Sequence, residues 1–226
     1  MIKYHNNIQQ GTPEWHALRC GVVTASKVGA LVTPKTLKVA KNEAVRSMAY
    51  DIAAQRITGH TEPSISTYHM QRGHLEESIA REVYSDRYYP VQQTGFVTRQ
   101  IDSLHIGYSP DGLVGNDGLI EIKSRVAKYQ AQTIALNSVP REYSLQLQMG
   151  LLVTNRKWID FVSYSNGMPL YVERVYQSTD VRDTIISAVA YFEGLVKAIM
   201  EDYEMVASGL VQTERYEELE DEEIYA

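Results

Sequence analysis

The residue types that could do chemistry gather in two short segments, residues 109–112 (Ser-Pro-Asp-Gly) and residues 121–123 (Glu-Ile-Lys). Residues two apart in a strand share a face, so Glu121 and Lys123 are expected to point the same way. The Gly-Asn-Asp-Gly run at residues 115–118 predicts a turn that folds the preceding segment back and brings Asp111 opposite Glu121. Two carboxylates and one ammonium group are therefore expected to meet in one place.

A pair of carboxylates suits a hard cation such as Mg²⁺ or Mn²⁺, with water and phosphate oxygens completing the coordination shell. Protonated, Lys123 cannot bind the metal; it could orient or deprotonate the attacking water, or stabilise the charge that develops on phosphorus. These residue types predict metal-assisted hydrolysis of a phosphodiester. The short pattern also has an ordinary alternative, because Pro-Asp-Gly forms simple turns and Glu-x-Lys forms ion pairs on solvated strands.

Length and composition place this chain among ordinary globular proteins. Of its 226 residues, 44% are apolar and 22% are charged, which is enough to bury a substantial core. The single cysteine, Cys20, excludes an intrachain disulfide and a cysteine-based zinc site, and it favours a cytoplasmic protein over a secreted one. The first ten residues are polar and no apolar run approaches the ~20 residues that span a bilayer, so neither a signal peptide nor a membrane anchor is expected.

The net charge of −6 argues at first against a nucleic-acid partner, which normally leaves a basic footprint. The acidic excess lies at the C-terminal end, where residues 213–226 carry seven acidic residues and one base, Arg215. This segment accounts for the whole −6, so residues 1–212 are neutral and can still hold a local basic groove. The sequence predicts one domain over residues 1–212 and a flexible, solvated acidic tail over residues 213–226.

Apolar periodicity and capping residues predict the order of the elements. Helices are expected from Thr12 through Leu18, from a Thr24 cap through Val28 and Leu31, and between about Lys38 and Thr58 with Gly59 as the stop. Further helices are expected over residues 67–86 and 142–153, and in a long segment capped by Asp180. Strands are expected at residues 91–98, 103–109 and 119–124, and a hairpin at 158–164 and 170–177. In residues 67–86, the apolar stripe of Leu75, Ile79 and Val83 is expected on one face. The order predicts a mixed α/β fold.

Three further sequence blocks accompany the two chemical segments: a Gln-Gly-Thr-Pro-Glu-Trp run at residues 10–15 that continues through Arg19 to Thr-Ala-Ser at 24–26, an Arg-Gly-His-Leu-Glu-Glu run at 72–77, and a Tyr-Ser-Leu-Gln-Leu-Gln run at 143–148. In this order the blocks resemble the phage lambda exonuclease family, the YqaJ-type viral recombinase nucleases of the PD-(D/E)xK superfamily. Each block alone is weak, whereas together they span about residues 10–155. The resemblance implies a single-domain, restriction-endonuclease-like α/β core, with a mixed central sheet flanked by helices.

The resemblance assigns roles to the two chemical segments. Asp111 and Glu121 would be metal ligands, the main-chain carbonyl of Ile122 would be a third protein ligand, and Lys123 would act on the nucleophilic water. The implied cofactor is Mg²⁺, with Mn²⁺ as a substitute.

Two helix residues are implied to complete the catalytic group. The spacing from Gly73 favours Glu77 over its neighbour Glu76 as the carboxylate near the metal, although either could instead be a solvated helix residue. Gln146 matches the family glutamine that faces the site and helps to position water, the alternative being an exposed helix residue.

A second group is implied to bind the phosphate at the 5′ end of the substrate. Arg19, Ser26 and Ser109 match the family residues in this role, which suits a guanidinium fork and two hydroxyl donors, with Ser26 near the expected start of a helix. Trp15 is either a surface on which DNA stacks or a core anchor.

The resemblance implies a Mg²⁺-dependent 5′→3′ exonuclease that degrades one strand of linear double-stranded DNA with 5′-phosphorylated ends to mononucleotides. It further implies a homotrimeric ring, a single-strand annealing partner, a role in phage-type recombination and the host-cell cytoplasm if the gene is phage-borne. Alternatives are a structure-selective endonuclease of the same superfamily and a catalytically silent DNA-binding scaffold, which the presence of Asp111, Glu121 and Lys123 disfavours. Ser124-Arg125 departs from the Cys-Pro that follows the lysine in the best-known member.

Overall fold

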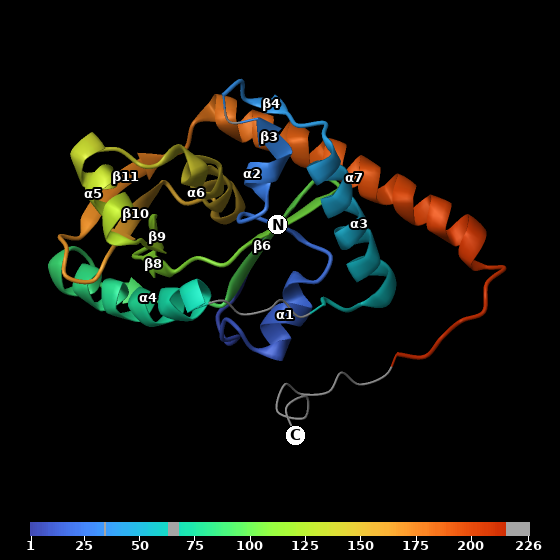
Figure 1. Ribbon diagram of the computed structural model, residues 1–226, viewed down its shortest axis with the longest axis horizontal. Helices are drawn as coiled ribbons and strands as arrows, with labels where there is room; N and C mark the ends of the chain where they lie inside the picture. The colour runs from blue at the N-terminus through green and yellow to red at the C-terminus, as the bar shows by residue number, and fades with distance from the viewer. Residues whose placement is uncertain (34, 63–67, 216–226) are drawn as a thin grey trace.

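The computed structural model describes residues 1–33, 35–62 and 68–215 as a mixed α/β fold (Figure 1), as expected from the sequence. The helices are α1 (Pro13–Arg19), α2 (Val28–Leu31), α3 (Glu43–Thr58), α4 (Tyr68–Arg87), α5 (Ala127–Leu136), α6 (Arg141–Thr154) and α7 (Thr179–Ala207). The strands are β1 (Ile2–His5), β2 (Val23–Thr24), β3 (Val32–Thr33), β4 (Lys38–Val39), β5 (Val91–Gln92), β6 (Phe96–Ile101), β7 (Leu104–Tyr108), β8 (Gly112–Val114), β9 (Gly118–Ser124), β10 (Trp158–Tyr164) and β11 (Tyr171–Tyr176). None of the described helices has the length and apolar character needed to cross a membrane.

Two sheets organise the fold. One has the strand order β1-β6-β7-β2, and the other has the order β11-β10-β9-β8-β5. Strands β9 and β10 run parallel because α5 and α6 carry the chain back between them, whereas β8 and β9 form the predicted antiparallel turn. Helix α4 packs on β9 and β10, and α6 packs on β10, β6 and β7, with α7 against α6 and α3 (Figure 1).

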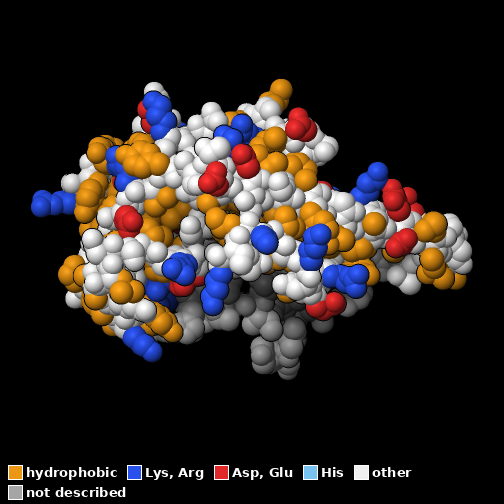
Figure 2. Space-filling model, turned by 90° about the horizontal axis from the view of Figure 1, so that it is seen from above, with side chains coloured by type: hydrophobic (Ala, Val, Ile, Leu, Met, Phe, Trp, Pro, Cys, Tyr) orange, Lys and Arg blue, Asp and Glu red, His pale blue; other side chains and the backbone are white. Residues whose placement is uncertain are grey.

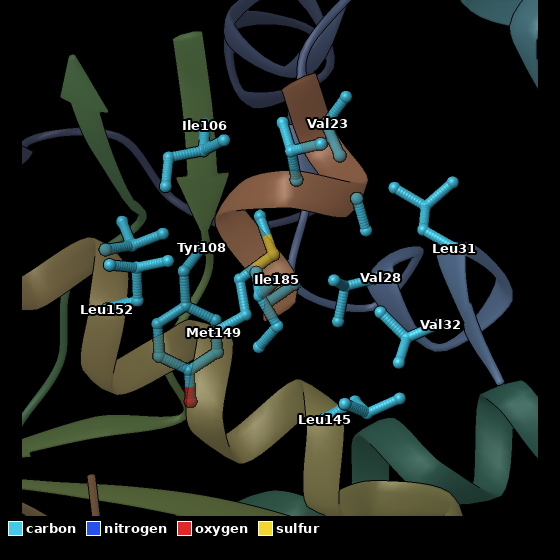
Figure 3. Packing of buried hydrophobic residues seen from close by; sticks show 14 of the residues in the cluster. Val23, Val28, Leu31, Val32, Ile106, Tyr108, Leu145, Met149, Leu152 and Ile185 are labelled. Carbon is cyan, nitrogen blue, oxygen red and sulfur yellow. The ribbon is translucent and has the colours of Figure 1, made fainter. Parts of the chain in front are cut away.

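The alternation of side chains along β9 divides the core in two. Ile120 and Ile122 pack with Ala80 and Tyr84 of α4 in the smaller hydrophobic cluster. On the other side of the strand, Leu119 belongs to the larger cluster under α6 and α7, part of which Figure 3 shows. Because Glu121 and Lys123 share the face of Leu119, the strand points both of them to the side covered by α6.

Several elements begin and end where local signals place them. The Thr12 side chain caps α1 by accepting a hydrogen bond from the Trp15 amide, and Pro13 occupies the first turn. Helix α3 ends at Gly59, whose φ of 65° is the left-handed conformation that glycine adopts easily. It begins later than predicted, because Lys38 and Val39 pair with β3 instead. Helix α7 is capped by Ser178, not by Asp180, which lies in its first turn.

The apolar stripe expected on α4 faces solvent. Leu75 is 71% exposed, whereas the buried residues among positions 72–87 of the helix are Ala80 and Tyr84. The inner side of α4 also carries charged side chains that turn toward the active-site region, so hydrophobic periodicity identifies the wrong face.

The sequence also gave no prediction for β1, β8 or α5. Regular structure ends with α7, and residues 208–215 form no further helix or strand. Most of the predicted flexible tail falls on residues 216–226, which lie outside the described residues, so that part stays a prediction.

Candidate active site

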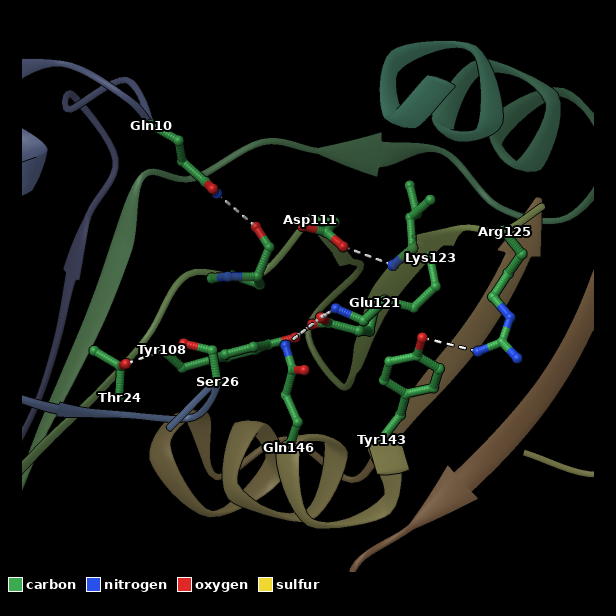
Figure 4. Close-up of polar contacts among 12 residues, drawn as sticks. Gln10, Thr24, Ser26, Tyr108, Asp111, Glu121, Lys123, Arg125, Tyr143 and Gln146 are labelled. Carbon is green, nitrogen blue, oxygen red and sulfur yellow. Dashed lines mark hydrogen bonds and ion pairs between the residues drawn. The ribbon is translucent and has the colours of Figure 1, made fainter. Parts of the chain in front are cut away.

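Strand β9 and the loop before β8 bring the predicted catalytic residues together (Figure 4). The Lys123 ammonium donates a hydrogen bond to Glu121 Oε1 at 2.7 Å, as expected for residues that share a strand face. Gly112 pairs with Ile120 across the β8–β9 turn, which places Asp111 beside the end of β9. There the Ile122 amide donates to Asp111 Oδ2 at 2.6 Å. The role of the Ile122 carbonyl as a metal ligand stays a prediction.

Three donors hold the Glu121 carboxylate, which is only 2% exposed. Its Oε1 accepts hydrogen bonds from Lys123 and from the side-chain amide of Gln146 on α6. Its Oε2 accepts one from the Tyr108 hydroxyl at 2.5 Å. This network fixes the carboxylate in one orientation and brings Gln146 into the site, as the family resemblance implied.

Helix α4 closes the other side of the site. Arg81 donates from Nε to the main-chain carbonyl of Asp111 at 2.8 Å, and its guanidinium also pairs with the Glu77 carboxylate. Glu77 therefore lies on the Asp111 side, where both line a cavity of about 570 Å³. Glu76 is directed elsewhere, because it accepts a hydrogen bond from Ser124 at 2.5 Å. Of the two neighbouring carboxylates, Glu77 is the one placed with Asp111.

The charged groups of this site shift one another's pKa values. Burial, followed by the negative charges of Glu121 and Glu77, raises the pKa of Asp111 well above its usual range. Burial also raises the pKa of Glu77, against the opposing effect of Arg81. Burial alone would lower the pKa of Lys123, but the Glu121 and Asp111 carboxylates outweigh it and raise the pKa, so the ammonium stays protonated at neutral pH.

The donor set fits a hard divalent cation with few protein ligands. Asp111, just before β8, and Glu121, in the middle of β9, supply carboxylate oxygens, and such a pair is what Mg²⁺ commonly uses while it keeps several waters. Within the described residues, no group of three or more His, Cys, Asp or Glu side chains is arranged to hold a metal by itself. The coordination shell would therefore depend on water and on the phosphate of a substrate.

A second group of contacting side chains, called the Arg19 pocket below, begins with Ser109, two residues before Asp111, and includes Arg19 and Trp15. The Arg19 guanidinium donates to Ser109 Oγ at 3.0 Å, and its carbon lies 4.1 Å from the centre of the Trp15 ring. The indole of Trp15 also donates to Ser109 Oγ, at 3.0 Å, and to the Gly95 carbonyl. Trp15 is thus the partly buried floor beneath Arg19. Burial lowers the pKa of Arg19 to about 10, so the guanidinium stays charged at neutral pH.

Ser26 lies in the turn that follows β2. Thr24 of β2 pairs with Gly107 of β7. Ser26 comes two residues after Thr24, and Ser109 comes two residues after Gly107. The Ser26 hydroxyl lies 3.2 Å from that of Thr24. The helix expected after Ser26 does form, as α2, but Lys27 and not Thr24 is its N-cap residue, and with only four residues it is too short to favour an anion at Ser26.

Three residues of these two groups were missed by the sequence analysis. Arg81 could have been predicted, because it lies four residues after Glu77 on the same helix face. Lys27 follows Ser26 directly, and its pKa is lowered by burial and by the neighbouring positive charge of Arg19, against the effect of Asp51. Tyr108 precedes Ser109, and nothing local distinguishes it from the other tyrosines of the chain.

The Ser124-Arg125 departure has a structural role. Arg125 is 8% exposed and donates to Glu142 and to the Tyr143 hydroxyl, at 3.0 and 2.8 Å. The ring of Tyr143 in turn lies 5.3 Å from the Lys123 ammonium. Arg125 therefore supports the aromatic floor beneath Lys123.

The charge that would suit binding of a polyanion is found at Arg19 and not over the face that Figure 2 shows. The face seen in Figure 2 carries acidic, basic and apolar side chains interspersed, without a broad surface of one sign. Arg19, in contrast, has no carboxylate partner among the residues that the structure describes. A guanidinium with free donors beside the Ser109 hydroxyl is suited to bind a phosphate.

Comparison with known proteins agrees with this arrangement. Residues 14–157, well over half of the chain, match the family described as the YqaJ-like viral recombinase domain. The chain belongs to this family. The sequence resemblance is thereby confirmed, and residues Asp111, Glu121, Lys123 and Gln146 all fall within the matched range. Among curated protein sequences, none matches the chain.

Solved structures support the same family assignment. An alkaline exonuclease from Laribacter hongkongensis, LHK-Exo, is 32% identical, with a TM-score of 0.78 over 88% of this chain and 100% of that one. The same protein in complex with dAMP gives a TM-score of 0.77 at the same identity and coverage. A phage-related exonuclease from Haemophilus somnus 129PT shares the fold, at 13% identity and a TM-score of 0.55 over 80% of this chain and 96% of that one. This YqaJ-like chain is thus homologous to exonucleases.

Proposed function

We propose that this protein is a Mg²⁺-dependent 5′→3′ exonuclease that removes mononucleotides from one strand of linear double-stranded DNA during phage-type recombination. One observation carries the proposal: Ser109 of the Arg19 pocket and the metal-ligand candidate Asp111 are two residues apart. Residues two apart in the chain are separated by at most about 7 Å, which is close to the separation of adjacent phosphates along a strand. A 5′-phosphate held by Arg19 would place the next phosphodiester at Asp111 and Glu121.

The residues of the chain have separable tasks in this reaction. Asp111 and Glu121 would hold the divalent cation, which when bound supplies charge neutralisation and water activation. Lys123 and Gln146 both reach Glu121 Oε1 and would orient the attacking water on the α6 side. Glu77, anchored by Arg81, would bind water on the α4 side. Arg19 would draw the terminal phosphate into register, with Ser26 and Ser109 adding hydrogen bonds.

The solved relatives favour release of single nucleotides. LHK-Exo is an exonuclease that was solved with dAMP, a mononucleotide. At 32% identity over the whole of that chain, a common product is the simplest expectation.

Linear duplexes labelled at either end, with and without 5′-phosphates, test the proposal beside a closed circle. We expect Mg²⁺ or Mn²⁺ to support release of mononucleotides from 5′-phosphorylated strands, with the circle left intact. Cutting of the circle would favour the structure-selective endonuclease, and absence of cleavage with binding retained would favour the silent scaffold. Asp111→Asn is the negative control, because it removes the formal charge of the carboxylate at nearly constant shape.

The family resemblance also predicts a homotrimeric ring and a single-strand annealing partner, and both stay predictions. Light scattering on the purified chain measures the first, since three copies of the 25.6-kDa chain are easily distinguished from one or two. Co-purification with annealing proteins from the same phage genome would test the second.

A further inference from the structure

The two oxygens of Glu121 are not equally free to bind a cation. Each carboxylate oxygen offers two lone pairs. Lys123 and Gln146 both donate to Oε1, so its lone pairs are used. Tyr108 donates to Oε2 at 2.5 Å, which leaves that oxygen a single lone pair. The hydrogen bonds therefore leave Glu121 with one vacant acceptor position.

The placement of Tyr108 is built into the packing of the core. It is the last residue of β7, it is 1% exposed, and its ring lies among the buried side chains beneath α6 (Figure 3). The ring passes so close to α6 that a Cβ added at Gly150 would lie 2.9 Å from its Cε1 atom. A larger residue at position 150 would displace the ring. Glycine there lets the phenol reach Glu121.

We infer that Tyr108 is a positioning residue: its hydrogen bond to Oε2 holds the Glu121 carboxylate in the orientation in which Lys123 and Gln146 occupy Oε1, so that the group cannot turn both oxygens to one divalent cation, and it thereby favours Mg²⁺ over Ca²⁺. The inference rests on the proposed function. Ca²⁺ takes six to eight oxygen ligands and often binds a carboxylate through both oxygens, whereas Mg²⁺ keeps octahedral geometry and uses one oxygen of each carboxylate. With one vacant acceptor position, the Glu121 carboxylate can bind Mg²⁺ through one oxygen, but it cannot bind Ca²⁺ through both.

The test replaces only the hydroxyl, with Tyr108→Phe. Tyr84→Phe is the matched control, because the Tyr84 hydroxyl donates in the same way to the buried Asp160, at 2.6 Å, on the opposite face of the sheet. Metal-free protein is titrated with Mn²⁺, free Mn²⁺ is measured by electron paramagnetic resonance, and the bound ion is displaced with Mg²⁺ or Ca²⁺. In Tyr108→Phe the Ca²⁺ affinity should rise about tenfold relative to the Mg²⁺ affinity, the effect of one hydrogen bond. In Tyr84→Phe the ratio should stay at the wild-type value.

Steady-state cleavage of a linear duplex with Mg²⁺ gives a second measurement. Because Tyr108 is buried away from DNA, its loss should lower kcat about tenfold and leave the KM for DNA unchanged. Gly150→Ala, which pushes on the ring, should shift the ion preference in the same direction, and it serves as the second variant should Tyr108→Phe unfold.

The outcomes separate this inference from the proposed metal site. Suppose that wild-type protein binds Mn²⁺ and that Asp111→Asn loses this binding. If Tyr108→Phe and Gly150→Ala then both keep the wild-type ratio of Ca²⁺ to Mg²⁺ affinity, the metal site stands and the role inferred for Tyr108 is wrong. If wild-type protein binds no Mn²⁺, or Asp111→Asn binds it equally well, the proposed site fails and the inference fails with it.

Discussion

The two faces of the central sheet carry similar polar clusters that do different things. On the α4 face, Tyr84 donates to Asp160; on the α6 face, Tyr108 donates to Glu121. The two carboxylates stand on neighbouring strands, and β10 residue Phe161, the neighbour of Asp160, is the one that pairs with Glu121. Each carboxylate is 2% exposed and receives a tyrosine hydroxyl at close range.

The clusters differ in their balance of charge. Asp160 is paired with Arg174 through two hydrogen bonds of 2.8 Å, and that guanidinium packs 3.5 Å from the centre of the Trp158 ring. One carboxylate and one guanidinium neutralise each other, and this cluster joins β10 to β11.

The active-site face holds charges that the chain leaves unmatched. Asp111, Glu121 and Glu77 outnumber the cations Lys123 and Arg81 that contact them. The neighbouring Arg19 pocket shows the reverse excess, with the cations Arg19 and Lys27 against the single carboxylate of Asp51. This contrast supports the proposal that the two unbalanced groups would bind ligands of opposite charge, a cation and a phosphate, whereas the balanced cluster would stabilise the fold.

Charge removal on the two faces should give the largest contrast. In Asp111→Asn we expect Mg²⁺-dependent cleavage to fall by at least ~10³-fold together with metal binding, because a main electrostatic contributor is lost. Asp160→Asn should melt at lower temperature but cleave at close to the wild-type rate while folded. Cleavage rates and melting curves of both variants measure the difference. Near-wild-type turnover in Asp111→Asn would contradict the assignment of the site.

The phosphate pocket should give the next largest effect. A terminal phosphate carries about two negative charges and an internal diester one, so wild-type protein should digest 5′-phosphorylated duplexes faster than 5′-hydroxyl duplexes. Arg19→Ala should remove most of this difference, a loss of about 2–3 kcal/mol or 30- to 150-fold, and should spare metal binding. Equal wild-type rates on the two substrates would argue against the pocket.

Breaking the balanced cluster should affect stability and not cleavage. Arg174→Leu leaves Asp160 buried with only the Tyr84 hydroxyl, and we expect the free energy of unfolding to fall by about 2 kcal/mol. The loss is smaller than for a fully buried pair, because the Arg174 side chain is 31% exposed. Urea unfolding measures it. A cleavage rate more than a few-fold below wild type at 25 °C would mean that the cluster also serves the active site.

The parts of the site that the sequence predicts are those fixed by local geometry. Strand alternation places Glu121 with Lys123, and the turn at residues 115–118 folds Asp111 back toward them. The α1 cap at Thr12 and the stop of α3 at Gly59 follow from local signals too.

What the sequence could not predict depends on contacts between distant elements. Tyr108 of β7 and Glu121 of β9 belong to different sheets. They meet because α6 packs against both sheets, on β7 in one and on β10 in the other. The apolar stripe on α4 predicted the wrong buried face, because Ala80 and Tyr84 are the residues that pack inward, while Leu75 is exposed to solvent. Hydrophobicity along one helix gives no information about which neighbour it will meet.

The acidic tail should give the smallest effect. Residues 213–226 supply the whole net charge of −6, and in the sequence they come after α7, which ends at Ala207 and contributes no residue to either unbalanced group. Deleting them should leave the cleavage rate on short duplexes within a few-fold of wild type at physiological salt, where charges more than about 8 Å apart are largely screened. At low salt, deletion should raise the apparent affinity for DNA, because a segment of the same sign as the phosphates is gone. A collapse of the rate at physiological salt would show instead that the tail is part of the folded domain, and would extend that domain beyond residue 212.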